Sequence, residues 1–271
     1  MTDQSAHATA YVLQEMSDHV LWLTLNRPEQ RNPLSSGMIA AIKDAIEMAN
    51  DNPQVRAVVL TGAGPVFSAG HDLKEMSELA VGSNLAHEEH LREILSRCAK
   101  MMLAIMHSPK AMIACVQGTA TAAGCQLVSA CDLAIASDAV HFCTPGVNIG
   151  NFCTTPLVGI GRNMHRKHAM ELALTGDMLS AEDAFRFGLV NRIVPAAKLR
   201  QVTEELAKKI ALKSAQGIRS GKQAYYRQMD MTIEEAFEYT TEVMIQGTLS
   251  QDSAEGTKAF FEKREPEWGD A

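Results

Sequence analysis

The amino-acid sequence predicts an α/β fold followed by a purely helical region. Apolar runs bounded by turn residues recur over about the first 200 residues and are typical of buried strands. Segments with helical periodicity separate these runs, and such alternation is typical of layered α/β domains. From about residue 198 onward only helical patterns remain. We therefore expect a strand-and-helix core over residues 1–197 and a helical region over residues 198–271.

The first part of the chain predicts three strands and one helix. Residues 11–16 and 20–26 are expected to be strands joined by a turn at 17–19. Ser35 or Ser36 can cap a helix, because apolar residues then recur on one face. These are Met38, Ile42, Ala45, Ile46 and Ala49. Residues 55–62 are almost wholly apolar and predict a buried strand, after which Gly62, Gly64 and Pro65 indicate a loop.

The middle of the chain continues the alternation. A long amphipathic helix is expected over 84–107, and a buried strand over 111–117. Small residues at 118–126 then open another helix, and residues 131–137 predict the next strand. A stretch rich in glycine and proline at 141–152 predicts a short strand and a loop. Three or more helices are expected between 154 and 188, before a short strand at 192–195.

The tail carries four helical patterns, at 202–214, 221–229, 232–249 and 252–264. These helices have large apolar side chains to bury, namely Phe237, Tyr239, Met244 and Phe260. The pattern allows packing against another subunit or against the same chain.

Composition and charge narrow the class of protein. The 271 residues are 46% hydrophobic and 21% charged, as in a globular protein, and the net charge of −7 argues against nucleic acid as a partner. No apolar run reaches about 18 residues, so no membrane span is expected. The first ten residues lack the features of a signal peptide. Six cysteines without a CxxC pair predict buried thiols and a reducing compartment, the cytoplasm. If an organellar leader peptide has been removed, the compartment is an organellar matrix.

Two sharp turns of small residues each follow a predicted buried strand. They are FSAGHD at 67–72 and AAGC at 122–125. Each can present backbone N–H groups at the start of a helical turn, and two converging N–H groups form an oxyanion hole. The alternative is that glycine serves only the geometry of two tight connections.

Other motifs are incomplete. Neither Gly62-Ala63-Gly64 nor Gly159-Ile160-Gly161 has the third glycine of a dinucleotide-binding motif. The histidine pairs at 87/90 and 165/168 have no matching carboxylates, so solvated helix faces are expected there, and no metal site.

Several blocks of residues occur in a distinctive order. They are Asn26-Arg27-Pro28, VRAVVLTGAG (55–64), FSAGHDLKEM (67–76), GTATAAGCQLVSACDLAIAS (118–137), TPGVNIG (144–150), LTGDMLSAEDAFRFGLVNRIV (174–194) and EGTKAFFEKREPEW (255–268). In this order they resemble the crotonase superfamily, the enoyl-CoA hydratases and isomerases. The resemblance covers nearly the whole chain.

The resemblance implies a crotonase-like spiral of ββα units with a C-terminal helical trimerisation region, as a homotrimer or a dimer of trimers. It implies an acyl-CoA thioester as ligand, with coenzyme A as part of the substrate and no tightly bound cofactor. The backbone N–H groups of His71 and Ala123 match the family's oxyanion hole. The implied substrate and CoA contacts are Arg27, Ala69, Gly70, Asp72, Leu73, Gly124 and Asn148, with Phe260 and Lys263 from the tail of a neighbouring subunit.

The sequence departs from the family pattern at two catalytic positions. Classical hydratases carry two glutamates, and these match Gln126 and Gly146 here. Glutamine cannot take a proton near neutral pH, and glycine has no side chain. His71 is a candidate replacement because its imidazole titrates near neutral pH; an imidazole turned to solvent or to CoA is the alternative.

These features support a lyase or isomerase that stabilises a thioester enolate without the two-glutamate hydration mechanism. Decarboxylation of a malonyl-type thioester would form the enolate without a carboxylate base. A different class is a non-catalytic acyl-CoA-binding protein whose catalytic pair has been lost.

Overall fold

The computed structural model describes residues 10–77 and 84–269. A six-stranded sheet with strand order β1-β2-β3-β5-β7-β10 forms its centre. The strands are β1 (Val12–Ser17), β2 (Val20–Leu25), β3 (Ala57–Gly62), β5 (Ala111–Val116), β7 (Leu133–Ser137) and β10 (Arg192–Val194). All neighbours pair in parallel except β1 with β2, so helices must cross over between the parallel strands.

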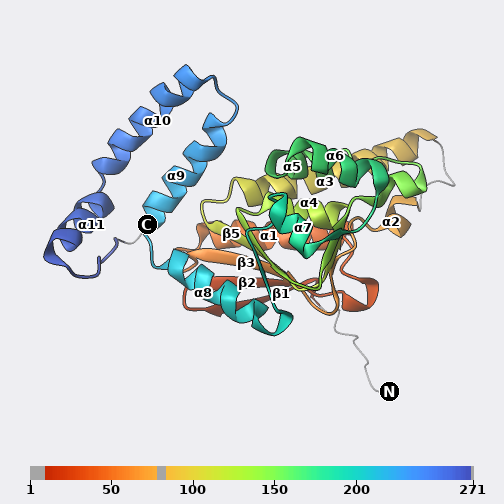
Figure 1. Cartoon of the computed structure of the whole chain (residues 1–271), viewed down its shortest axis with the longest axis horizontal. Coiled ribbons are helices and arrows are strands. Elements are labelled where there is room, and N and C mark those ends of the chain that lie inside the picture. Colours follow the sequence, from red (N-terminus) through yellow and green to blue (C-terminus); the bar gives the residue numbers. More distant parts are fainter. Residues whose placement is uncertain (1–9, 78–83, 270–271) are drawn as a thin grey trace, which may run out of the picture.

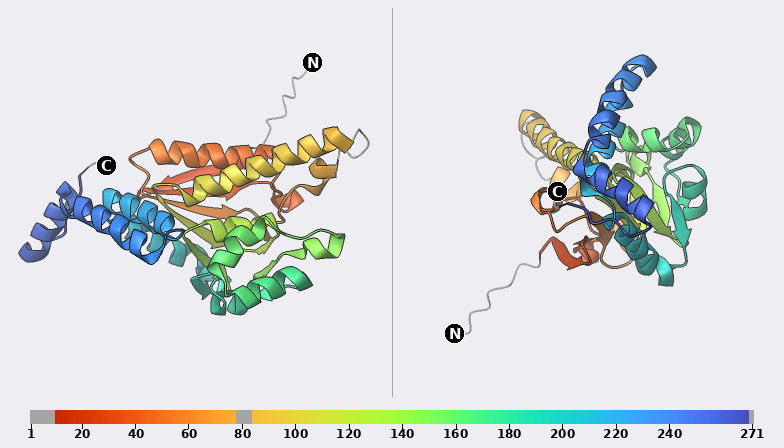
Figure 2. Two further views of the ribbon diagram at one scale, coloured as in Figure 1. Left: turned by 90° about the horizontal axis from the view of Figure 1, so that it is seen from above. Right: turned by 90° about the vertical axis from the view of Figure 1, so that its left-hand side faces the viewer.

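Helices cover both faces of this sheet (Figures 1 and 2). The first face packs against α1 (Ser36–Asp51), α3 (Asn84–Met106) and α4 (Ala123–Ala130) in one large apolar cluster. The second face packs against α8 (Leu199–Ala211) in a smaller cluster that includes Trp22, Val59 and Ile113. Burial on both faces explains why β3 and β5 are apolar at consecutive positions.

A second sheet of very short strands lies beside the first. Its order is β4-β6-β8-β9, and its strands are β4 (Val66–Ser68), β6 (Thr119–Thr121), β8 (His141–Cys143) and β9 (Leu179–Ser180). Short helices connect its strands or follow them. They are α2 (Leu73–Ser77), η2 (Pro145–Ile149), α5 (Pro156–Asn163), α6 (Arg166–Thr175) and α7 (Ala181–Arg186). The predicted α/β core, with three helices between 154 and 188, is therefore confirmed.

The first hairpin differs slightly from the prediction. Ser17 ends β1, so the turn has two residues, Asp18 and His19, with φ angles of 47° and 63°. Two left-handed residues form the tight turn that matches the twist of a hairpin. The predicted cap of α1 is confirmed at Ser35, whose hydroxyl accepts a hydrogen bond of 3.3 Å from the backbone N–H of Met38.

The C-terminal helices divide into two parts. α8 packs on the sheet, although it lies after residue 198. The next three helices, α9 (Ala215–Gln228), α10 (Ile233–Thr248) and α11 (Gln251–Glu262), form an arm that projects from the core on the left of Figure 1. Phe237, Met244 and Phe260 on this arm are each at least 70% exposed, so packing within the same chain leaves them uncovered.

One buried ion pair joins the arm to the core. Lys222 on α9 places its ammonium group 2.7 Å from the carboxylate of Asp132, which lies just beyond α4. The same carboxylate accepts hydrogen bonds from the Tyr226 hydroxyl at 3.0 Å and from the Met112 N–H at 2.7 Å. This polar network fixes the direction in which α9 leaves the core.

The C-terminal residues fold back and fasten the arm. The indole N–H of Trp268 donates to the backbone oxygen of Leu212 at 2.8 Å, just before α9. Asp252 on α11 accepts hydrogen bonds from the Ser214 hydroxyl and from the Gly269 N–H. The two ends of the three-helix arm are thereby held together.

The remaining sequence expectations concern thiols and membranes. All six cysteines are unpaired and buried, as predicted. Across residues 10–77 and 84–269, no helix has both the length and the apolar character needed to cross a bilayer. Residues 1–9, where no signal peptide is predicted, lie outside the described residues.

Candidate active site

The two turns of small residues lie against each other. Gly70 has a φ of +84°, and a Cβ built on it would lie 2.9 Å from the Thr121 oxygen and 3.1 Å from the backbone nitrogen of Ala123. Both the left-handed conformation and the close approach require glycine. The structure therefore brings the residue before His71 next to the first residue of α4, as an oxyanion hole needs.

Further contacts fix the relative position of the two turns. A Cβ on Gly124 would lie 2.4 Å from the Ser68 oxygen, so no larger residue fits there. The Thr121 hydroxyl donates to the Ala69 oxygen at 2.9 Å, and the Ala69 N–H donates to the Arg31 oxygen at 2.9 Å. The turns form one rigid unit.

The two N–H groups expected to bind an oxyanion are available. Ala123 is the first residue of α4, where the helix offers no acceptor. His71 forms a bridge with Leu34, but the bond of this bridge runs from the Leu34 N–H to the Gly70 oxygen at 2.7 Å. Within the described part of the chain, neither N–H has a hydrogen-bond acceptor.

Ala122 holds the second turn in a strained conformation. Its φ and ψ are 49° and −117°, a combination that disfavours residues with a Cβ. Its N–H donates to the Cys143 oxygen at 2.9 Å, which ties the turn to β8. The surrounding hydrogen bonds thus hold the strained backbone and, with it, the direction of the Ala123 N–H.

The His71 side chain borders a groove of about 670 Å³. The groove is lined by Glu29, Gln30, Arg31, Pro33, Ala69, His71, Asp72, Leu73 and Lys74. Burial lowers the pKa of His71, an effect that the charge of Glu75 opposes. Its Nε2 is covered and has no partner among the described residues. The imidazole is therefore neutral at pH 7 and retains an unused hydrogen-bonding atom.

Two cations of this groove, Arg31 and Lys74, were not singled out from the sequence. Arg31 and Asn32 are both left-handed, with φ angles of 65° and 50°. The Asn32 amide is buried and donates to the oxygens of Ala63 and Val66. Asparagine tolerates this conformation. Asn32 before a proline was therefore the feature of the sequence that could have indicated the turn at Arg31.

Asp72 and Leu73, two other predicted CoA contacts, line the same groove, and Arg27 lines a smaller pocket that shares Glu29 and Gln30 with it. Arg27 stacks over the Tyr11 ring at 4.9 Å and donates to the Gln30 amide at 3.1 Å. Asp72 accepts hydrogen bonds from the N–H groups of Lys74 and Glu75, so its carboxylate caps α2. Leu73 is 61% exposed.

Gln126 lies on α4 three residues after Ala123 and is only 7% exposed. Its side-chain oxygen is covered and has no hydrogen-bond partner in the described structure. A buried amide with an unused oxygen is unusual in a folded protein.

Gly146 lies in η2, directly against Cys153. A Cβ built on Gly146 would lie 3.0 Å from the Cys153 sulfur and 3.2 Å from its backbone nitrogen. Burial raises the pKa of the thiols of Cys143, to about 11, and of Cys153. These thiols are neutral, and the space beside Gly146 is filled by one of them. Asn148, in the same turn, lies beside Gly176 on the α6 side, 3.1 Å from where a Cβ would stand.

Phe260 and Lys263 lie on and just after α11, at the outer end of the arm. Figures 1 and 2 show this arm at one end of the molecule and α2 at the other end. Within one chain, these two residues therefore do not join the groove of His71.

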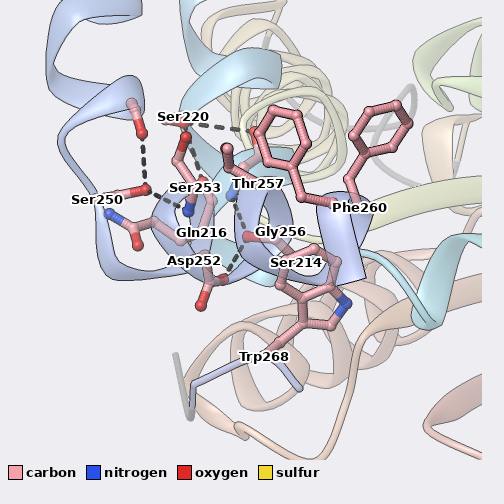
Figure 3. Close-up of a pocket in the computed structure, with 13 residues that line it drawn as sticks. Ser214, Gln216, Ser220, Ser250, Asp252, Ser253, Gly256, Thr257, Phe260 and Trp268 are labelled. Carbon is pink, nitrogen blue, oxygen red and sulfur yellow. Dashed lines mark hydrogen bonds between the residues drawn. The ribbon is translucent and has the colours of Figure 1, made fainter. Parts of the chain in front are cut away.

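The arm has a cavity of its own, of about 460 Å³ (Figure 3). Serines, Thr257 and the aromatic rings of Phe260, Phe261 and Trp268 line it. Asp252 is the acidic group there, and hydrogen bonds already engage both of its oxygens. Among the described residues, no three His, Cys, Asp or Glu side chains gather as a metal site would require.

Comparison with known proteins identifies the family. A sequence model described as "Enoyl-CoA hydratase/isomerase" matches residues 15–271. The chain is 41% identical over 263 residues to "Enoyl-CoA hydratase domain-containing protein 3, mitochondrial" from Xenopus laevis, covering 97% of this chain and 87% of the relative.

Solved structures agree in fold. An enoyl-CoA hydratase from Mycobacterium smegmatis has a TM-score of 0.90 at 43% identity, over 95% of this chain and 98% of the other. Human enoyl-CoA hydratase domain-containing protein 3 also has a TM-score of 0.90, at 37% identity, over 95% and 100% of the two chains. With its rigid pair of small-residue turns, the chain belongs to the enoyl-CoA hydratase/isomerase family, a part of the crotonase superfamily.

Proposed function

We propose that this protein binds acyl-CoA thioesters and stabilises a thioester enolate with the backbone N–H groups of His71 and Ala123. The observation that carries the proposal is the approach of Gly70 to the Ala123 nitrogen, since it brings two free N–H groups to neighbouring turns. When an enolate forms, negative charge develops on the thioester oxygen. Removing one donor of this kind typically costs a factor of about 10²–10³ in rate.

The same site does not support hydration by two glutamates. Gln126 offers an amide where the family pattern has the first glutamate, and Gly146 offers no side chain for the second. Cys153 already occupies the space next to Gly146. The enolate must therefore arise without a carboxylate pair as acid and base.

A second candidate reaction is the decarboxylation of a malonyl-type thioester, and the neutral surroundings favour it. His71 is held neutral by burial, and Gln126 and Cys153 carry no charge. No carboxylate at these positions repels a substrate carboxylate. When the bond between the α-carbon and the carboxylate breaks, its electron pair moves into the enolate and CO₂ leaves. A water molecule then supplies a proton to the α-carbon, and the hydroxide left behind combines with CO₂ as bicarbonate.

The bound CoA would follow the groove around the His71 turn. Arg31 and Lys74 offer positive charge to its phosphates, and Ala69, Asp72 and Leu73 form the turn beside them. Phe260 and Lys263 would come from a neighbouring subunit. The exposed apolar face of the arm supports a homotrimer or a dimer of trimers. We expect no tightly bound cofactor, with CoA as part of the substrate.

The thiols and the names of the relatives support a reducing compartment. Six unpaired buried cysteines fit a reducing compartment, either the cytoplasm or an organellar matrix. Relatives from Xenopus laevis and Homo sapiens carry the word mitochondrial in their names, which supports the matrix.

The experiment that tests the function combines binding with turnover. Crotonyl-CoA hydration is followed by the loss of enone absorbance, and the binding of butyryl-CoA is measured by calorimetry. We expect binding without hydration near the common range of ~1–10³ s⁻¹. Fast hydration would refute the glutamate-free mechanism. Binding without turnover of crotonyl-CoA or malonyl-CoA would identify a non-catalytic acyl-CoA-binding protein, and no binding at all would refute the proposal.

A further inference from the structure

The amino-terminal edge of the central sheet carries two adjacent cations. Arg56 and Lys110 directly precede β3 and β5, and the first residues of these parallel strands, Ala57 and Ala111, are paired in register. Because neighbouring strands lie about 4.8 Å apart, the two basic residues start side by side. The chain as a whole has a net charge of −7, so this edge differs in charge from the average of the protein.

Helix α9 brings a third cation to the same place. The Lys222 ammonium group donates to the backbone oxygen of Lys110 at 3.0 Å, so this face of α9 packs against the start of β5. Arg219 lies three residues before Lys222 and therefore on the same face of the helix. The Arg56 guanidinium donates to the Lys213 oxygen at 3.0 Å, just before α9. Arg56, Lys110 and Arg219 thus form a basic cluster where the arm leaves the core.

Lys110 is the buried member of the basic cluster, since the residue is only 5% exposed. Burial lowers the pKa of its ammonium group, and the positive charges of Arg219 and Arg56 lower this pKa further. An ammonium group has three N–H donors, but that of Lys110 has a single acceptor among the described residues, the Asn52 oxygen at 3.2 Å. Lys110 therefore keeps unused donors close to two other cations.

The basic cluster has no counterion within the described residues. None of its three side chains forms an ion pair across residues 10–77 and 84–269. Asp132 is the acidic residue on this side of α9, and its carboxylate is already bonded to Lys222 and Tyr226. Asp51, at the end of α1, is exposed and unpaired in the same part of the chain. Three cations that repel one another would be stabilised by an anion from solution.

The composition of the cluster fits a phosphate group better than a carboxylate. Guanidinium groups donate pairs of N–H bonds to phosphate oxygens, and an ammonium group adds a compact charge. A phosphate group directs its oxygens to the corners of a tetrahedron, so side chains from two strands and a helix can each reach a different oxygen. A carboxylate has only two oxygens, which lie in one plane.

The basic cluster is separate from the groove of His71. β3 and β5 have six residues each, so at about 3.3 Å per residue they place about 20 Å between the cluster and the opposite edge of the sheet. The segments that follow this opposite edge lead to the turns of His71 and Ala123. A phosphate at the cluster is therefore not the phosphate of a thioester bound in the same chain's groove.

We propose that Arg56, Lys110 and Arg219 form a phosphate-binding site at the base of the arm. Inorganic phosphate and the phosphate group of an ester share the required chemistry. Arg219 belongs to the arm, and Arg56 and Lys110 belong to the core, so a bound phosphate joins the two parts. The inference is independent of the proposed function, because thioester binding uses the other edge of the sheet.

The first test is calorimetry on the full chain with inorganic phosphate, adenosine monophosphate and acetate. The pH is fixed, and sodium chloride keeps the ionic strength constant, so that general screening does not contribute. We expect at least one of the two phosphates to bind saturably and acetate not to bind. The phosphate that binds more tightly tells whether the site takes the free ion or an ester.

Substitutions then assign the binding to the basic cluster. Arg219→Gln removes one cation from a half-buried position that has no hydrogen bond within the described structure, so this variant should fold. It should weaken phosphate binding at least about tenfold, because a charge-assisted hydrogen bond is lost. Lys110→Met should have the same effect. Arg166→Gln, on the exposed surface of α6, is the matched control and should leave the dissociation constant unchanged.

A further variant distinguishes the cluster from the groove of His71, where Arg31 and Lys74 also offer positive charge. Lys74→Met should retain the phosphate binding that Arg219→Gln loses. The opposite pattern, with binding lost in Lys74→Met and kept in Arg219→Gln, would place the anion in the groove and overturn the inference.

Hydrogen exchange measured by mass spectrometry locates the ion without any substitution. Phosphate should slow the exchange of amides at residues 215–222, at the start of α9, and leave those of α6 unchanged. Equal exchange with and without phosphate at 215–222 would overturn the inference. So would the absence of binding by both phosphates, or acetate binding as tightly as they do.

Discussion

Replacing Lys222 by methionine should destabilise the protein by about 3 kcal/mol. Its ammonium group lies 2.7 Å from the Asp132 carboxylate, and the two side chains are only 9% and 19% exposed. It also donates to the backbone oxygen of Lys110 at 3.0 Å. Methionine fills the same space but leaves the carboxylate buried without its cation.

The magnitude follows from what remains around Asp132. Removing one partner of a buried ion pair costs about 3–5 kcal/mol. Two donors stay in place, the Tyr226 hydroxyl and the Met112 N–H, so the lower end of the range applies. Substituting both residues, as Lys222→Met with Asp132→Asn, removes the unpaired charge. The double variant should therefore be more stable than Lys222→Met alone.

The assay is urea unfolding at one fixed protein concentration, because association of subunits would make stability depend on concentration. Lys209→Met, on the exposed side of α8, is the matched control and should change stability by less than about 0.5 kcal/mol. A loss below about 1 kcal/mol for Lys222→Met would refute the reasoning. So would a double variant that is less stable than the single one.

Three further predictions concern the turns and the arm. Gly70→Ala should lower the free energy of unfolding by about 1–3 kcal/mol and weaken butyryl-CoA binding in calorimetry. The reason is that φ of Gly70 is +84° and that Thr121 and Ala123 crowd the new methyl group. Gly161→Ala is the control, because a methyl group there meets nothing within 4 Å. Burial lowers the pKa of His71 below the ordinary 6.5. As the pH drops below about 6.5, the imidazole takes up a proton in the unfolded state before it does so in the folded state, and the free energy of unfolding falls. His71→Gln should flatten this part of the pH–stability curve, and an unchanged slope would contradict the burial of the imidazole. Trp268→Ala loses the bond to the Leu212 oxygen, so amides of α11 should exchange hydrogen faster while those of β3 stay unchanged.

Much of the core could be predicted because its strands are long and buried on both faces. The runs that became β3 and β5 are apolar at nearly every position, and the periodicity of α1 continues over 16 residues. The second sheet could not be predicted as a sheet. Its strands have only two or three residues, too few to show a period, and their pairing depends on glycines such as Gly124 that allow close approach.

The candidate site was predictable where it depends on backbone geometry. Small residues around Gly70 and Ala123 marked both turns. Arg31 was not predictable as a groove residue, because its place depends on two successive left-handed residues. The contact of Gly146 with Cys153 also escaped prediction, since a glycine pattern does not tell which atom comes close.

Ala122 shows where part of the folding free energy of the protein is used. Glycine would adopt its φ of 49° and ψ of −117° without steric cost, so Ala122→Gly should raise stability. The strain of the alanine is relieved whenever the turn opens, so the hydrogen bond from its N–H to the Cys143 oxygen must hold the turn closed in the free protein. The direction of the Ala123 N–H is therefore set by folding itself, before any ligand arrives.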